Sequence, residues 1–199
     1  MQIELQQWLG LSPLMLLYAF FAIGVAAYIR GYSGFGFSAL TVTSLALILP
    51  PSEVVPTAYM LEVAASIHML PLVWRSIDWK ILRWLVIGAV MGTPFGIIFL
   101  EEVPQETMRL VISGIVLTAS LLLWKNIRIK SSANWYSILA VGFFSGVING
   151  AAAIGGLPVV LFFLSISLGS ALSRASMVAY LFIIDLYAVF LPGSQQLIS

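Results

Sequence analysis

Two carboxylic acids, Glu62 and Asp185, lie well inside long apolar runs of the sequence. An aspartate at the centre of a membrane helix costs about 2.5–3.5 kcal/mol on insertion scales, so such residues usually face the protein interior and serve pathways or proton relays. Because removal from water favours the protonated form of a carboxyl group, either residue could carry a proton. The alternative is a structural pair with Arg30 or Arg174. Glu62, Asp185 and Arg174 are therefore candidates for proton coupling or gating.

Two clusters of small and polar residues each precede a short apolar run. The first cluster comprises Arg30, Gly31, Ser33, Gly34, Gly36 and Ser38, and the second comprises Asn149, Gly150, Gly155, Gly156 and Pro158. A helix that begins inside the protein presents unpaired N–H groups and the positive end of its dipole, which suit an anion. Glycines let the backbone approach an oxyanion closely, and Ser33, Ser38 and Asn149 add side-chain donors. We expect the two breaks to face each other near the membrane midplane and to bind one anion.

These residues also have simpler structural explanations. Small residues permit close packing of membrane helices, which accounts for any single glycine and for the stripe Gly88-x-x-x-Gly92-x-x-x-Gly96. Arg30 and Arg174 are also explained as interfacial arginines, because a long basic side chain reaches the membrane surface readily. The similar placement of the two clusters is what favours a binding site.

The elements that position these groups must be hydrophobic helices. Of the 199 residues, 61% are hydrophobic and only 9% are charged, and the mean hydropathy is +1.05. An ordinary soluble domain carries about 25% charged residues, so this chain has too few to cover a soluble surface. A net charge of +1, no cysteine and a single histidine argue against nucleic-acid binding, thiol chemistry and a Cys/His metal site. The sequence predicts an all-α, polytopic transmembrane protein without a cofactor.

Eight apolar runs follow one another along the chain. They cover residues 14–29, 37–49, 54–73, 84–100, 110–124, 135–148, 157–168 and 171–191. A spanning helix needs about 20 residues, so the second and seventh runs are too short to cross alone. Since glycine-rich segments precede both, we expect broken or re-entrant helices there, and six to eight crossings in total. The first residues carry Glu4 but no basic residue, which argues against a cleavable signal peptide.

Charged loops predict the orientation in a cell (inner) membrane. The loops 74–83 and 125–133 hold six of the nine basic residues and are flanked by tryptophans, whereas residues 101–106 are acidic. Basic loops stay in the cytoplasm, and tryptophans gather at the membrane interface. We therefore expect the first two loops inside and the acidic loop outside.

The chain repeats weakly at an offset of 118 residues. Segments 30–40 and 51–57 correspond to 148–158 and 169–175, in the same order of helix, break, short run, polar corner and long helix. With five spans between them, the copies would face opposite ways, which predicts an inverted repeat of the kind found in secondary transporters. We divide the chain into a first repeat, 1–130, and a shorter second repeat, 131–199.

These features resemble the sulfite exporter TauE/SafE family of membrane permeases. The resemblance covers nearly the whole chain and rests on the two glycine clusters with Pro158, the polar corners at 50–57 and 169–176, and the repeat. The first copy departs from the family pattern, because Phe37, Ser38 and Leu40 stand where the second copy has Gly155, Gly156 and Pro158. The resemblance implies a secondary transporter of small anions such as sulfite, thiosulfate or sulfoacetate, coupled to protons or driven by the substrate gradient.

The second repeat is apparently incomplete, whereas members of this family usually complete both halves. The chain is then a shortened member, a truncated one, or one completed by a partner subunit or a second copy. The alternative function is a non-transporting scaffold or partner-dependent subunit. An intramembrane enzyme is a weaker alternative, because one histidine and two buried carboxyl groups make a poor catalytic set. The expected contacts are a small anion and the lipid bilayer, with no nucleic acid.

Replacing Gly34 or Gly155 by a bulky residue is expected to abolish anion transport while leaving membrane insertion intact, because the side chain would fill the space meant for the anion. Transport assays and the yield of inserted protein measure the two effects. Unchanged transport would contradict the expected site.

Overall fold

The computed structural model describes residues 12–125, 134–166 and 168–191, and their regular structure is entirely helical. The helices are α2 (Pro13–Ser33), α3 (Phe37–Leu45), α4 (Pro51–Val73), the short 3-10 helix η1 (Trp74–Ser76), α5 (Trp79–Glu102), α6 (Gln105–Trp124), α7 (Trp135–Ala152), α8 (Gly156–Ser165) and α9 (Ser170–Phe190). Each α-helix corresponds to one of the eight apolar runs. The predicted all-α fold is therefore confirmed.

Five of these helices are long and apolar enough to cross a membrane, namely α2, α5, α6, α7 and α9. Helix α4 has 23 residues but carries Glu53 and Glu62. Helices α3 and α8 have 9 and 10 residues. At 1.5 Å per residue each reaches about 15 Å, roughly half of a bilayer core of about 30 Å. The short helices therefore cannot cross alone, as the sequence predicts.

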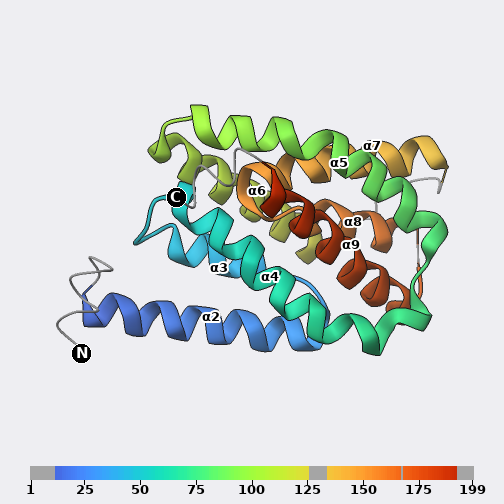
Figure 1. Ribbon diagram of the computed structural model, residues 1–199, viewed down its shortest axis with the longest axis horizontal. Helices are drawn as coiled ribbons and strands as arrows, with labels where there is room; N and C mark the ends of the chain where they lie inside the picture. Colours follow the sequence, from blue (N-terminus) through green and yellow to red (C-terminus); the bar gives the residue numbers. More distant parts are fainter. Residues whose placement is uncertain (1–11, 126–133, 167, 192–199) are drawn as a thin grey trace.

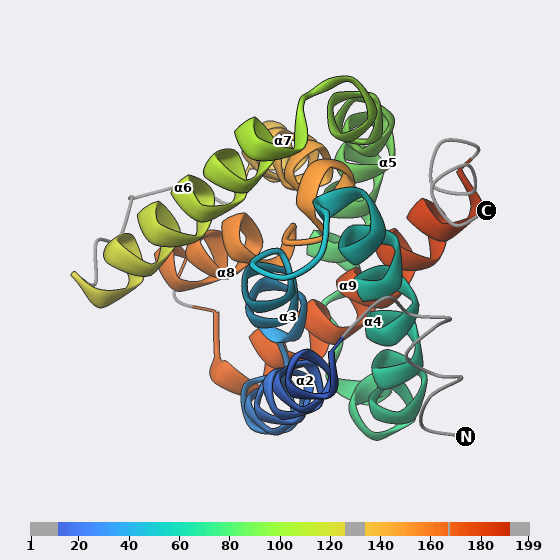
Figure 2. The ribbon, with the colours of Figure 1, turned by 90° about the vertical axis from the view of Figure 1, so that its left-hand side faces the viewer.

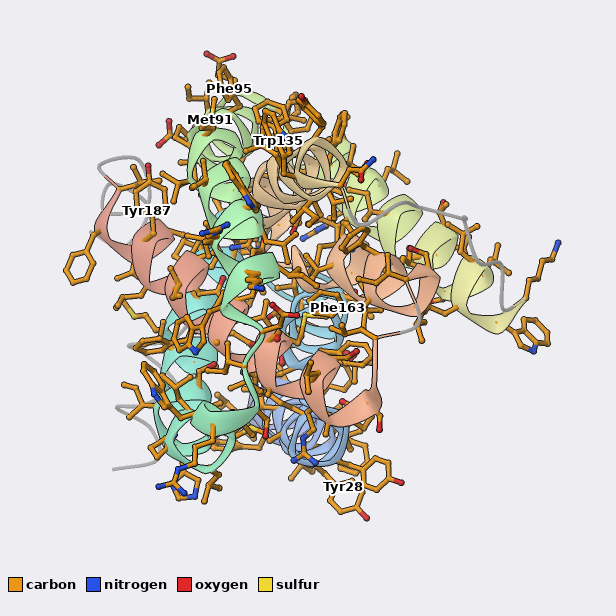
Figure 3. The ribbon with its side chains drawn as sticks, turned by 90° about the vertical axis from the view of Figure 1, so that its right-hand side faces the viewer. Tyr28, Met91, Phe95, Trp135, Phe163 and Tyr187 are labelled. Carbon is orange, nitrogen blue, oxygen red and sulfur yellow. The ribbon has the colours of Figure 1, made fainter. Side chains whose placement is uncertain are left out.

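Helices α5 and α7 lie along one edge of the bundle, α2 lies along the opposite edge, and the others fill the space between them (Figure 1). Helix α4 packs along α9 in the middle. Helix α6 projects sideways from the bundle (Figure 2), with its contacts on α3, α4 and α8. The outward face is apolar: Tyr28, Met91 and Phe95 point away from the helices, whereas Phe163 lies among them (Figure 3). This distribution suits a bundle surrounded by lipid.

Left-handed residues interrupt the chain at both clusters. Helix α2 ends where Gly34 adopts φ +82°, and Gly36, with φ +91°, precedes α3. Helix α7 ends where Ala153 adopts φ +57°. A left-handed residue after the last helical turn is a common helix stop, and glycine meets it without a steric penalty. The helices are therefore broken as predicted, although the breaks are narrower, at 34–36 and 153–155.

The closest helix contact joins α5 and α7 through two facing rows of glycines. The rows are Gly88, Gly92 and Gly96 on α5, and Gly142, Gly146 and Gly150 on α7. A Cβ atom on any of them would overlap a carbonyl oxygen of the facing helix. Successive α5 glycines face successively later α7 residues, so the two helices are parallel. The packing interpretation of the α5 stripe is confirmed, and Gly150 belongs to the same contact.

Parallel α5 and α7 begin at the same end of the bundle. The rings of Trp84 and Trp135 lie 5.3 Å apart there, and those of Trp74 and Trp79 lie 5.0 Å apart. The N-terminal ends of α5 and α7 thus lie on one side of the bundle, which agrees with the predicted placement of the two basic loops on one side. Residues 126–133, most of the second loop, lie outside the described residues.

The element order of the two predicted copies is the same: α2, α3 and α4 match α7, α8 and α9. The inverted symmetry of the copies stays a prediction. The boundary proposed at residues 130 and 131 falls outside the described residues.

Gly92→Ala is expected to lower the thermal unfolding midpoint of the detergent-solubilised protein, because overpacking a tight contact costs about 1–3 kcal/mol. The matched control is Gly24→Ala, at an exposed position of α2 with no atom near the new Cβ. There the better helix propensity of alanine should leave the midpoint unchanged or raise it. Equal midpoints for both variants would contradict the packing role of the stripe.

Candidate functional site

Residues from both breaks line one buried cavity. Its walls are Phe35, Gly36, Ser38, Ala39, Ala153, Ile154, Gly156, Leu157 and Leu181, and its volume is about 10 Å³. By this measure a water molecule needs about 10–15 Å³, so the cavity holds one water at most. Of the residues named from the sequence, Gly36, Ser38 and Gly156 meet here. The two breaks therefore adjoin the same small cavity.

Two helices begin at this cavity. Helix α3 starts after Gly36 and α8 after Gly155, and no side chain caps either N-terminus. The first residues of both helices are buried, among them Phe37, Ser38 and Gly156. Uncapped N-terminal N–H groups with the helix dipole behind them attract negative charge. The cavity thus adjoins the positive ends of two helices.

Arg30 and Glu62 form an ion pair inside the protein rather than at its surface. The Arg30 guanidinium donates to Glu62 Oε1 and, over 2.6 Å, to Ser66 Oγ, while Ser38 Oγ donates to Glu62 Oε2 over 2.8 Å. Arg30 is 1% exposed and Glu62 0%. The interfacial explanation of Arg30 is therefore wrong, because its charge is buried and paired. The pair joins α2, α3 and α4.

Asp185 has a different environment. Its Oδ1 accepts from Asn149 Nδ2 over 2.7 Å, and Asn149 Oδ1 accepts from the N–H of Gly155 over 3.0 Å. Asp185 is 0% exposed, and its Oδ2 is a buried oxygen without a hydrogen-bond partner among the described residues. Arg30 is near enough to act electrostatically on Asp185. Of the alternatives, Glu62 forms the structural pair with Arg30, while Asp185 is linked to the second break.

Tyrosine and serine side chains satisfy the interrupted backbone of α7. The Tyr59 hydroxyl lies 2.6 Å from the carbonyl oxygen of Asn149 and 2.9 Å from that of Gly150. Ser145 Oγ donates to the Gly155 carbonyl and lies 2.6 Å from the Tyr180 hydroxyl. Carbonyl groups at a helix end need such partners in the absence of water. The second break is therefore fixed by side chains from α4, α7 and α9.

The remaining residues of the first cluster lie toward the end where α9 begins. Arg174 donates to the Gly31 carbonyl over 2.9 Å. A Cβ at Gly34 would lie 2.7 Å from Arg174 Cγ. Ser33 contacts the backbone of Phe35. Arg174 therefore supplies a cation at the C-terminus of α2, where it complements the helix dipole.

Apart from Gly156 at the cavity, the second cluster separates into three environments. Asn149 and Gly155 belong to the Asp185 network, Gly150 to the α5–α7 contact, and Pro158 to an apolar hollow against α6. A Cβ at Gly155 would lie 2.7 Å from Asn149 Cβ and 2.8 Å from the Ser145 carbonyl oxygen. Neither Gly34 nor Gly155 lines the cavity, so bulky replacements there would act through packing against Arg174 or Asn149 rather than by filling the cavity. That membrane insertion survives these replacements stays a prediction.

Sequence reasoning missed Phe35, Tyr59, Ser66, Ser145 and Tyr180. The sequence could have indicated two of them. Tyr59 lies three residues before Glu62 and Ser66 lies four residues after it, so all three share one face of a helix. No local signal marks Ser145 or Tyr180, because their partners are distant in sequence. The described residues contain no group of three metal-ligating side chains, and none is needed for the chemistry above.

A multi-pass helical bundle with two broken helices around a buried polar centre is the architecture of a membrane permease. The chain belongs to the sulfite exporter TauE/SafE family, whose model matches residues 19–196. This match confirms the family resemblance seen in the sequence. Membership of a transporter family is consistent with the expectation that the protein is not an enzyme. Searches of the curated proteins and of the solved structures return no match.

Glu62→Gln is expected to destabilise the protein by about 3–5 kcal/mol, because it leaves the Arg30 charge buried without its counter-ion. The exposed control Glu101→Gln should stay within about 0.5 kcal/mol. Chemical unfolding in mixed micelles measures both.

The double variant Arg30→Met/Glu62→Leu separates pairing from simple loss of polar groups. Since both charges are removed, it should be more stable than either single variant. Additive destabilisation would contradict the view that the two residues act as a pair.

Proposed function

We propose that this protein is a secondary transporter of small sulfur-containing anions, such as sulfite, thiosulfate or sulfoacetate, which bind where the two breaks meet. The observation that carries the proposal is the single cavity lined by residues of both breaks, Gly36 and Ser38 from one and Gly156 from the other. Membership of the sulfite exporter TauE/SafE family supports the class of substrate.

The chemistry of the cavity favours an anion. The N-termini of α3 and α8 adjoin it and lack side-chain caps. Backbone N–H groups can replace part of the hydration shell of a sulfur oxyanion, since its oxygens are hydrogen-bond acceptors. Sulfite is larger than water, so the cavity of about 10 Å³ must widen before an anion enters. The conformation described therefore has no room for a sulfur oxyanion, and the cavity must open toward one side of the membrane during transport.

Asp185 is the group that we assign to proton coupling, in preference to Glu62. One buried arginine, Arg30, faces two buried carboxyl groups, and Glu62 already holds it in an ion pair. An ionised Asp185 would leave this core with excess negative charge and would repel an anion. A proton on Asp185 removes that repulsion. Anion and proton should therefore bind together, which makes the coupling a symport.

The orientation and surroundings complete the proposal. We place the 74–83 and 125–133 loops in the cytoplasm of a cell (inner) membrane and residues 101–106 outside, from the distribution of basic residues. The alternative of a partner-dependent scaffold predicts no anion binding by the isolated chain.

A thermal-shift screen of purified protein in detergent tests the substrate class. Sulfite, thiosulfate or sulfoacetate is expected to raise the unfolding midpoint selectively over acetate and chloride, because a ligand of the folded state stabilises it by mass action. Uptake of the same anion into proteoliposomes should follow. Well-folded protein that responds to none of these anions would contradict the proposed function.

Asp185→Asn is expected to abolish the stimulation of anion uptake by an imposed pH gradient, because the amide cannot bind the proton. Anion–anion exchange should persist, since a neutral side chain does not repel the substrate. Glu101→Gln, exposed at the end of α5, is the control and should keep the stimulation. If Asp185→Asn retains gradient-driven uptake, the proton-binding group lies elsewhere.

A further inference from the structure

A second hollow lies beyond the cavity between the breaks, and Phe35 separates the two. The second hollow has a volume of about 250 Å³ and lies between α8, α9 and the end of α2. Among the described residues, Phe35 alone lines both spaces. Phe35 therefore lies between a hollow large enough for a small anion and a cavity with room for one water at most.

The larger hollow has the features of an entry site for anions. Its polar wall consists of Ser33, Ser170, Ser173 and Arg174, and the rest is apolar. Arg174 is exposed and forms no ion pair with a described residue. A cation at the mouth of an otherwise apolar hollow raises the local concentration of anions. The hollow lies at the start of α9, which packs against η1, on the same side as residues 74–83.

The backbone on either side of Phe35 is suited to move. Gly34 and Gly36 are the two glycines with positive φ among the described residues, and they flank Phe35 directly. The Ser33 hydroxyl lies 2.7 Å from the Phe35 carbonyl oxygen and 2.8 Å from the Ile29 carbonyl oxygen. One hydroxyl proton can serve only one of these acceptors at a time. The Phe35 N–H also donates to Ser33 Oγ over 3.3 Å, and the Gly34 N–H donates to the Arg30 carbonyl over 2.7 Å. The hydroxyl bond to the Phe35 carbonyl can be exchanged without leaving the hydroxyl unpaired, but these two backbone bonds must lengthen if the segment moves.

The second break lacks such a residue. Position 153, which lies 118 residues after Phe35, is the small Ala153. Ala153 also adopts a positive φ and lines the inner cavity. The two breaks therefore share a backbone feature, but only the first carries a bulky side chain at this point.

We propose that Phe35 is the gate between the Arg174-lined hollow, which serves as a vestibule for small oxyanions and sulfonates, and the anion cavity between the breaks. The proposal rests on the proposed transport function for the identity of the anion. Rotation of the segment 34–36 would move the Phe35 ring and join the two spaces on the side of residues 74–83. Phe35 acts as a positioning residue that controls access and binds no anion itself.

Cysteine accessibility tests the gate directly, since the chain contains no cysteine. Single cysteines at Ala39, in the inner cavity, and at Ser173, in the vestibule, are treated in detergent with an anionic methanethiosulfonate that carries a sulfonate group. The thiolate attacks the sulfenyl sulfur, a mixed disulfide forms, and methanesulfinate leaves. Because labelling scales with the open fraction, Ala39→Cys should react about tenfold or more slower than Ser173→Cys.

Adding Phe35→Ala should raise the labelling rate of Ala39→Cys about tenfold, because Phe35 closes off the inner site. The labelling rate of Ser173→Cys should stay within about twofold of its rate with Phe35 present, because the vestibule is already accessible. Phe35→Leu keeps much of the bulk and should retain the protection. Phe20→Ala removes an exposed phenylalanine of α2 and is the matched control. Gel filtration and the unfolding midpoint establish that each variant is folded.

Rapid labelling of Ala39→Cys with Phe35 present, or slow labelling after Phe35→Ala in folded protein, would overturn the gate. The assay needs no transport, so it is independent of the proposed function. A labelling change without anion uptake supports the gate and contradicts the transport proposal. Anion uptake with unchanged labelling supports the transport proposal and contradicts the gate.

Discussion

A backbone that is interrupted inside an apolar solvent must find hydrogen-bond partners within the protein, and the rest of this structure depends on that requirement. An unsatisfied N–H or C=O group in hydrocarbon costs several kcal/mol. At the end of α2, Arg174 donates to the Gly31 carbonyl. At the end of α7, the Tyr59 hydroxyl lies within hydrogen-bond distance of the Asn149 and Gly150 carbonyl oxygens and can donate to one of them at a time. These contacts come from α9 and α4, so the two breaks determine where the central helices must lie.

A link between the helix before a break and the long helix that follows occurs twice in the chain, with different chemistry and at positions that do not correspond at the offset of 118 residues. In the first, Arg30 at the end of α2 contacts Glu62 on α4, and in the second Asn149 at the end of α7 contacts Asp185 on α9. A charged pair holds the first link permanently, because either charge alone would be costly to bury. The amide in the second link leaves one oxygen of Asp185 without a partner among the described residues.

The glycines divide into two physical roles that look alike in sequence. Those of the α5–α7 contact remove side chains so that two parallel backbones can touch. Gly34 and Gly36 instead provide positive φ values at the end of one helix and before the next. Gly150 belongs to the packing group even though it lies in a cluster that resembles a binding site. The glycines of α5 and α7 therefore serve helix packing, whereas Gly34 and Gly36 serve the interruption between α2 and α3.

The sequence by itself determined the helical membrane fold, the eight helices, the two breaks and the burial of Glu62 and Asp185. Hydrophobic run length, glycine placement and the cost of charge in lipid are local quantities, and each can be evaluated from the chain alone. Only the tertiary structure decided that Arg30 is buried against Glu62, that Asp185 is bound by Asn149, and that Phe35 separates two hollows. Arg30 and Glu62 are 32 residues apart, and Asn149 and Asp185 are 36 apart. Such partners are chosen by helix packing, which no local pattern in a single sequence specifies.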